Sequence, residues 1–131
     1  SAPDREVYIN QEWRFSFEYP EGWEPRENTF GNYYSKFNVV LYPEEGKAYG
    51  RPVLINVVVP EFAENAYRDL DTNSEQTLFA GIEVTRHTYQ HASLDKTSYL
   101  IPFGKHTILL ATNHHYEDLF AIVLNSFEFI E

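Results

Sequence analysis

The sequence predicts an α+β fold in which an antiparallel β-sheet is flanked by helices. Apolar and polar residues alternate strictly through "WRFSFEYP", which is the pattern of a half-buried strand. A run of β-branched residues fills "VLINVVVP", as in a central strand. The last sixteen residues, "YEDLFAIVLNSFEFIE", begin with helical spacing and end with a period of two.

Length and composition indicate one folded domain. The chain has 131 residues, of which 43% are hydrophobic and 17% aromatic. Such a composition supplies a sizeable core and is unlike that of a disordered chain. We expect residues 1–131 to form a single domain, with residues 1–5 as a flexible N-terminal segment.

Strands joined by loops are expected through the first sixty residues. The alternation places Trp13, Phe15, Phe17 and Tyr19 on one face of a strand that ends at Pro20. "KFNVVLYP" predicts a second strand, and the β-branched run predicts a third. "ENTFGNYYS" and "EEGKAYGRP" are rich in turn-forming residues and predict loops.

A helix and three further strands are expected in the middle of the chain. Pro60 is expected to open a helix over residues 61–71, because proline is favoured at the first helical position. "DTNSEQ" predicts the end of this helix. "GIEVTRHTYQH", "TSYLIPFG" and "HTILLATN" predict strands, with a tight hairpin turn at Gly104 and Lys105.

The C-terminal pattern predicts a second helix and a short last strand. Asn113 is expected to cap a helix over residues 114–125, because its side chain can accept a hydrogen bond from the first turn. After Ser126 the period changes to two, which predicts a strand. We expect one antiparallel sheet in all, with Trp23 and Phe127 in its core.

In this order, the motifs resemble the PsbP-like superfamily, also called the Mog/PsbP fold. "FSFEYPEGW" is similar to the family's opening strand, turn and tryptophan, and "INVVVPEFAENAYRDL" to its central strand and first helix. "YLIPFGKHTILLAT" is similar to its paired long strands, and the last sixteen residues to its closing helix and strand. The resemblance spans nearly the whole chain and implies an antiparallel sheet with helices on its faces, an α/β/α sandwich.

The resemblance also implies a location and a kind of function. Members of the family are secreted or lipid-anchored envelope proteins in bacteria, or thylakoid-lumen proteins in plants, and most are binding or assembly factors. Most bacterial members have no assigned function. What the resemblance implies here is an extracytoplasmic protein, either secreted or carrying a lipid anchor upstream of Ser1. The matched motifs are structural, so they carry over no catalytic or metal-binding residue.

Charge and composition argue against several classes of function. Ten basic and twenty acidic residues give a formal net charge of -10, which repels phosphate backbones, so we expect no nucleic-acid partner. No stretch approaches the roughly 20 apolar residues that span a bilayer. There is no cysteine, which excludes a disulfide framework and thiol chemistry.

The histidines and serines do not predict a metal or catalytic site. His114 and His115 are adjacent at a predicted helix start, where their side chains diverge and the helix dipole disfavours a cation. His87 and His91 are four residues apart on a predicted strand, and therefore about 13 Å apart. No G-x-S-x-G motif or glycine-rich phosphate loop is present. We expect no metal, no cofactor and no catalytic residue.

Aromatic residues in the predicted loops are the candidate binding residues. Tyr33, Tyr34, Tyr49 and Arg51 belong to residue types that are enriched at binding hot spots. Alternatively, the same residues cap the core beneath long loops.

We therefore expect a non-catalytic, extracytoplasmic binding or assembly module that acts as a monomer on an unknown protein partner. One alternative is a small-molecule or metal-ion carrier, which would need a deep pocket with convergent polar groups. A second alternative is an enzyme, which would need titratable groups in mutual contact.

Overall fold

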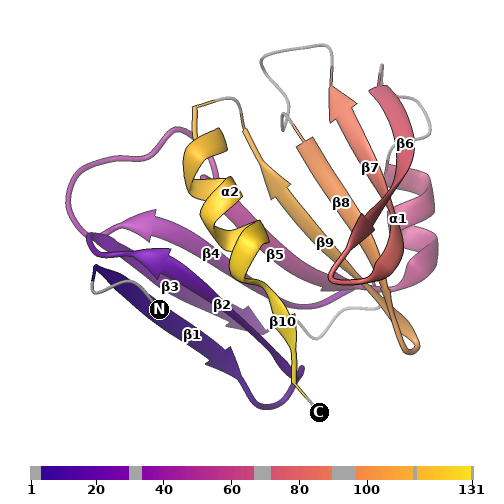
Figure 1. The fold of residues 1–131 in the computed structure, drawn as a ribbon, viewed down its shortest axis with the longest axis horizontal. Helices are drawn as coiled ribbons and strands as arrows, with labels where there is room; N and C mark the ends of the chain where they lie inside the picture. Colours follow the sequence, from indigo (N-terminus) through magenta and orange to yellow (C-terminus); the bar gives the residue numbers. More distant parts are fainter. Residues whose placement is uncertain (1–3, 30–33, 67–71, 90–96, 114, 131) are drawn as a thin grey trace.

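The computed structural model describes residues 4–29, 34–66, 72–89, 97–113 and 115–130 (Figure 1). These residues form ten strands and two helices. In chain order they are β1 (Arg5–Asn10), β2 (Phe15–Pro20), β3 (Trp23–Thr29), β4 (Ser35–Pro43), β5 (Val53–Val58), α1 (Pro60–Ala66), β6 (Thr72–Phe79), β7 (Ile82–Tyr89), β8 (Thr97–Phe103), β9 (His106–Thr112), α2 (Glu117–Ser126) and β10 (Glu128–Phe129).

The strands form two antiparallel sheets. The small sheet has the order β1-β2-β10, and the large sheet has the order β3-β4-β5-β9-β8-β7-β6. Every strand pair is antiparallel, so the predicted antiparallel α+β class is confirmed. The prediction of one sheet is wrong, because β1 and β2 pair with β10 and not with the large sheet. Alternation within a strand shows which face is buried but not which sheet the strand joins.

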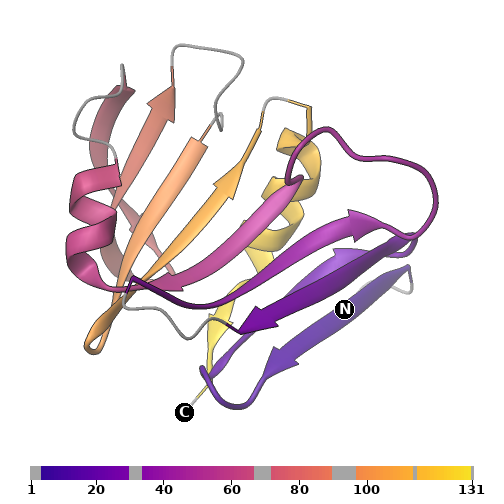
Figure 2. The same ribbon diagram turned by 180° about the vertical axis from the view of Figure 1, so that it is seen from behind.

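The core lies between the large sheet on one side and the small sheet with α2 on the other. Figures 1 and 2 show α2 and the small sheet together on one face of the large sheet, and α1 on the opposite face. Phe15, Phe17 and Tyr19 of β2 all point into this core, as their alternation predicts. Phe127 is buried there too, whereas Trp23 is only partly buried and packs at the margin. The expectation of a core position is confirmed for Phe127 and is only partly met by Trp23.

Two of the best-marked sequence features appear where they were predicted. All six residues of β5 are buried, and the strand lies between β4 and β9 in the large sheet. Phe103 pairs with His106 across the β8–β9 hairpin, which leaves Gly104 and Lys105 as its two turn residues. Gly104 has a positive φ of 59°, a conformation that glycine adopts at low cost.

Two strands replace segments that were predicted as irregular. β3 continues to Thr29 and pairs with β4, so the predicted loop in "ENTFGNYYS" begins too early. β6 covers most of "DTNSEQ" and pairs with β7 along its whole length. Both are outermost strands of the large sheet. Their described residues are largely exposed and polar, so neither shows an apolar alternation that could reveal it. α1 is described over Pro60–Ala66, and residues 67–71 of the predicted helix lie outside the described residues.

Helix α2 begins three residues later than predicted and ends one residue later. Its N-cap is Tyr116 and not Asn113, and Tyr116 makes no side-chain capping hydrogen bond. At the other end, the Ser126 hydroxyl donates to the carbonyl oxygen of Ile122 at 2.8 Å. The hydroxyl oxygen of Ser126 also accepts a hydrogen bond from the backbone N–H of Glu18 at 2.8 Å. Ser126 therefore ends the helix and ties the change from helix to strand to β2. In the described part of the chain, neither helix is long and apolar enough to cross a lipid bilayer.

Candidate binding surface at the start of helix α2

The loop between β4 and β5 is held against the segment that leads into α2. The backbone N–H of Tyr49 donates to the hydroxyl oxygen of Tyr116 at 2.9 Å. The side-chain amide of Asn113 donates to the backbone oxygen of Tyr49 at 2.8 Å. The side-chain oxygen of Asn113 accepts a hydrogen bond from the backbone N–H of His115 at 2.9 Å. Asn113 therefore joins the loop to the helix start, a role different from the helix cap that was predicted for it.

Four rings from three separate segments meet at this place. Tyr49 stacks on His115, with ring centroids 4.4 Å apart and planes inclined by 20°. Trp23, the first residue of β3, meets Tyr116 edge to face at 5.7 Å. Edge-to-face and stacked pairs of this kind stabilise an arrangement beyond the burial of area alone. We call Trp23, Tyr49, His115 and Tyr116 the aromatic surface.

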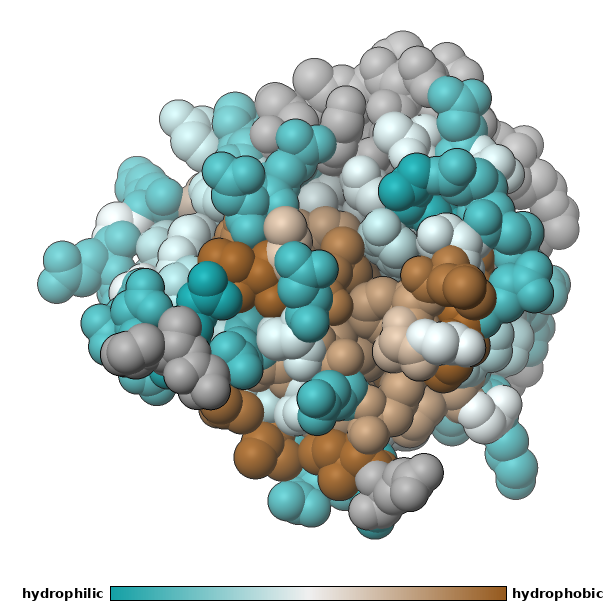
Figure 3. All heavy atoms as spheres, in the orientation of Figure 1, coloured by the Kyte–Doolittle hydropathy of each residue, from teal (hydrophilic) through white to brown (hydrophobic). Residues whose placement is uncertain are grey.

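The aromatic surface is accessible from solvent. Tyr49 is 68% exposed although both polar groups of its backbone are hydrogen-bonded to the segment that leads into α2. A hollow of about 340 Å³ lies beside it and is lined by Trp23, His115, Tyr116, Glu117, Asp118 and Leu119. Figure 3 shows that the hydrophobic residues of this view gather in its middle and along its lower edge, with hydrophilic residues around them. The aromatic surface itself consists of rings that carry polar atoms, and it lies beside the carboxylates of Glu117 and Asp118. Aromatic residues with a polar rim are common at interfaces.

The four predicted binding residues do not lie together. Tyr49 and Arg51 are both exposed and lie beside the start of β5. Tyr34 is 53% exposed, but its backbone oxygen accepts from Val59 and its ring lies 6.2 Å from that of Phe62. Tyr34 is therefore at the far end of β5, against the start of α1. Tyr33, and Phe30 in the same predicted loop, lie outside the described residues.

A solved protein structure is similar to this chain over nearly its whole length. No protein-family model matches the chain, and no curated protein matches it in sequence. Among solved structures, the chain is similar to cyanobacterial PsbP (CyanoP) from Synechocystis sp. PCC 6803, with a TM-score of 0.57 and 16% sequence identity. The alignment covers 98% of this chain and 94% of that one. This chain has a PsbP-like fold. The fold resemblance that the sequence motifs suggested is therefore confirmed.

The histidines among the described residues lie on separate segments of the chain. His115 lies before α2 and stacks on Tyr49, while His114 and His91 lie outside the described residues. His87 is on β7, a strand as predicted. Among the described residues, no three His, Asp or Glu side chains come close enough together to hold a metal ion.

Among the described residues, three side chains have shifted pKa values, and burial is the largest cause of each shift. Burial raises the pKa of Tyr8, with a further contribution from its hydrogen bond to Glu27. The pKa of Tyr19 is also raised, first by burial and then by the charges of Glu6 and Glu44. Burial lowers the pKa of His87. Tyr8 and Tyr19 belong to the small sheet and His87 to the large sheet, so these groups do not form one titrating cluster.

Sequence reasoning missed most of the aromatic surface. Trp23 was predicted only as a core residue, His115 was considered only as a metal ligand and rejected, and Tyr116 was not among the candidate binding residues. The one signal for the site was the position of Tyr49 in a polar loop. The hydrogen bond between Tyr49 and Tyr116 joins residues 67 positions apart, and no local sequence pattern predicts it.

Proposed function

We propose that this chain is a non-catalytic binding or assembly module that contacts a protein partner through the aromatic surface. The observation that carries the proposal is the state of Tyr49, whose ring is exposed while its backbone is fixed on both sides. A large ring that is already ordered loses little conformational freedom on binding. Tyrosine and tryptophan are also the residue types most enriched among binding hot spots.

The pKa shifts support a binding role in preference to a catalytic one. Catalytic acids and bases are commonly found as perturbed groups that act together in a cleft. Here the shifted groups are dispersed over two sheets, and burial is the first cause in each case. Burial of this kind accompanies ordinary packing and needs no catalytic explanation.

The proposed location is outside the cytoplasm, in the cell envelope or secreted. The support for this location is the PsbP-like resemblance of the sequence motifs, together with the PsbP-like fold. Fractionation of cells that express the full precursor would test it. Recovery of the protein only from the cytoplasmic fraction would contradict the proposed location.

Site-specific photocrosslinking tests the proposed binding role. A photoreactive phenylalanine analogue placed at Tyr49 should give one discrete crosslinked protein in the cells that make this chain. Leu78 is the matched control, because it is 74% exposed and lies on β6 at the other end of the large sheet. The same analogue at Leu78 should give no such product. Equal crosslinking at both positions, or none at Tyr49, would overturn the proposed role of the aromatic surface.

A further inference from the structure

A second hollow adjoins the aromatic surface and shares Trp23 with the first. It has a volume of about 390 Å³, and its lining residues are Glu6, Tyr19, Glu21, Gly22, Trp23, Glu24 and Glu44. The backbone N–H of Glu44 donates to the oxygen of Gly22 at 2.9 Å, which joins the end of β4 to the turn before β3. Trp23 therefore stands between one hollow that is rich in carboxylates and another that is lined by rings.

The two hollows carry a strongly negative lining. Glu6, Glu21, Glu24 and Glu44 line one, and Glu117 and Asp118 line the other. Among the described residues that line the two hollows, there is no lysine or arginine. Burial and the charges of Glu6 and Glu44 raise the pKa of Tyr19, which lines the same hollow.

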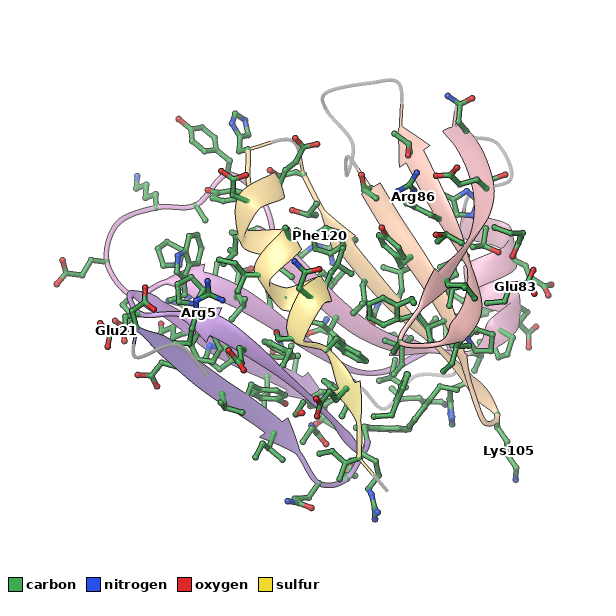
Figure 4. The ribbon with its side chains drawn as sticks, viewed as in Figure 1. Arg5, Glu21, Glu83, Arg86, Lys105 and Phe120 are labelled. Carbon is green, nitrogen blue, oxygen red and sulfur yellow. The ribbon has the colours of Figure 1, made fainter. Side chains whose placement is uncertain are left out.

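The basic residues near this end of the molecule leave most of that charge available. Arg26 is paired with Glu24 at 2.7 Å and lies over the ring of Tyr42, so it is already engaged. Figure 4 shows Arg5 and Glu21 at the same end of the small sheet. Arg5 forms no ion pair with any of the described residues and does not line the hollow. The carboxylates of Glu6, Glu21 and Glu44 likewise form no ion pair within the described chain.

We propose that the partner presents a basic segment and places an arginine side chain in the hollow beside Trp23, between Glu21 and Glu44. This inference rests on the proposed function and names the chemistry of its partner. An indole ring is the best aromatic surface for a cation, and arginine can stack on it while its fork of N–H groups bonds carboxylates. The net charge of -10 would also attract a basic partner over a distance.

Tryptophan fluorescence gives a direct test on the whole chain. The chain has two tryptophans, so Trp13→Phe leaves Trp23 as the only one. The probes are three blocked peptides of equal length, each with four arginines, four lysines or four glutamates spaced by glycine and serine. The arginine peptide should change Trp23 emission saturably and bind more tightly than the lysine peptide. The glutamate peptide should have no effect.

Two double variants separate a local site from general attraction. Glu21→Gln/Glu44→Gln should weaken arginine-peptide binding about fivefold, the effect of removing two solvent-exposed charge contacts. Glu64→Gln/Glu83→Gln changes the net charge equally at exposed positions outside the hollow and should leave binding nearly unchanged. Figure 4 shows Glu21 and Glu83 at opposite sides of the molecule. Thermal melts should show that both double variants remain folded.

Three results would overturn the inference: equal weakening in both double variants, lysine binding as tight as arginine binding, or no saturable change at Trp23. The crosslink at Tyr49 then shows whether the proposed binding role is wrong as well, or only the arginine site. If the crosslink survives Glu21→Gln/Glu44→Gln at full yield, the aromatic surface binds a partner but the arginine site is wrong. If position 49 gives no crosslink even when Glu21 and Glu44 are unchanged, the proposed function itself is wrong.

Discussion

The molecule contains two aromatic groupings that differ in what their rings can do. In the phenylalanine cluster of Phe15, Phe17, Phe79 and Phe127, the Phe127 ring lies 5.5 Å from those of both Phe15 and Phe79. The aromatic surface of Trp23, Tyr49, His115 and Tyr116 uses rings with polar atoms, and one of these atoms bonds the backbone of the facing loop. Phenylalanine has no polar atom and gains only by burial, whereas tyrosine, tryptophan and histidine can remain half in water. The comparison indicates that the first grouping determines stability and that the second can serve recognition.

The largest effect is expected from Phe127, which connects the two sheets. It stacks on Phe15 of the small sheet, packs against Phe79 of the large sheet, and is 4% exposed. Phe127→Ala should lower the free energy of unfolding by roughly 3–5 kcal/mol, the usual cost of removing a buried aromatic ring. Urea denaturation measures this loss, and Phe127→Leu should cost much less because it leaves a smaller cavity. A loss below about 1 kcal/mol for the alanine variant would show that the phenylalanine cluster does not hold the sheets together.

A middle-sized effect is expected from Trp23, which belongs to the aromatic surface but packs against the core margin. Trp23→Ala should cost roughly 2 kcal/mol, about half the usual value for a fully buried tryptophan. It should also abolish arginine-peptide binding. Trp23→Phe should recover most of the stability but less of the binding, because phenylalanine offers a weaker surface to a cation. If Trp23→Ala instead lowers the free energy of unfolding by roughly 3–5 kcal/mol and leaves peptide binding unchanged, Trp23 belongs functionally with the phenylalanine cluster.

Tyr8 shares a property with each aromatic grouping, because its ring is buried like the phenylalanines and it carries a polar hydroxyl group like the rings of the aromatic surface. Its hydroxyl donates to Glu27 at 2.5 Å and accepts from the Asn10 amide at 3.0 Å. Tyr8→Phe should lower the free energy of unfolding at pH 7 by about 1–2 kcal/mol, because a hydrogen bond to a charged group is lost.

The pH dependence of that loss has a defined sign. Burial raises the pKa of Tyr8 in the folded state above its ordinary value of 10, so the folded state retains the proton while the unfolded state releases it. The stability contributed by the hydroxyl is thus fully present below pH 10 and decreases as the pH rises above 10. The difference in the free energy of unfolding between wild type and Tyr8→Phe should therefore become smaller in urea titrations above pH 10. A difference that widens above pH 10 would contradict the raised pKa.

The sequence predicted the buried half of the molecule better than its exposed half. β5, the β8–β9 turn and the inward face of β2 follow from hydrophobic pattern and glycine chemistry, which act locally. β6 has no such pattern, since its described side chains are mostly in solvent. The aromatic surface depends on contacts between residues far apart in the chain, so no window of sequence contains it. Tyr34 and Tyr49 were grouped because both are loop tyrosines, yet β5 places them at opposite ends of the sheet.

The smallest effect on stability is expected from substitution of Tyr116. This substitution tests whether the ordered backbone of Tyr49 contributes to partner binding. Tyr116→Phe keeps the edge-to-face contact with Trp23 but removes the acceptor for the Tyr49 N–H. Because Tyr49 is exposed, water can replace that acceptor, and the free energy of unfolding should fall by no more than about 0.5–1 kcal/mol. Hydrogen exchange at the Tyr49 amide should become faster, and the crosslink yield from position 49 should fall because the ring is less ordered before binding. Tyr49→Phe is the control for the exchange measurement, because it keeps the ring and leaves the backbone N–H bonded to Tyr116. If Tyr116→Phe speeds exchange without lowering the crosslink yield, the fixed backbone of Tyr49 is a feature of folding and contributes nothing to recognition.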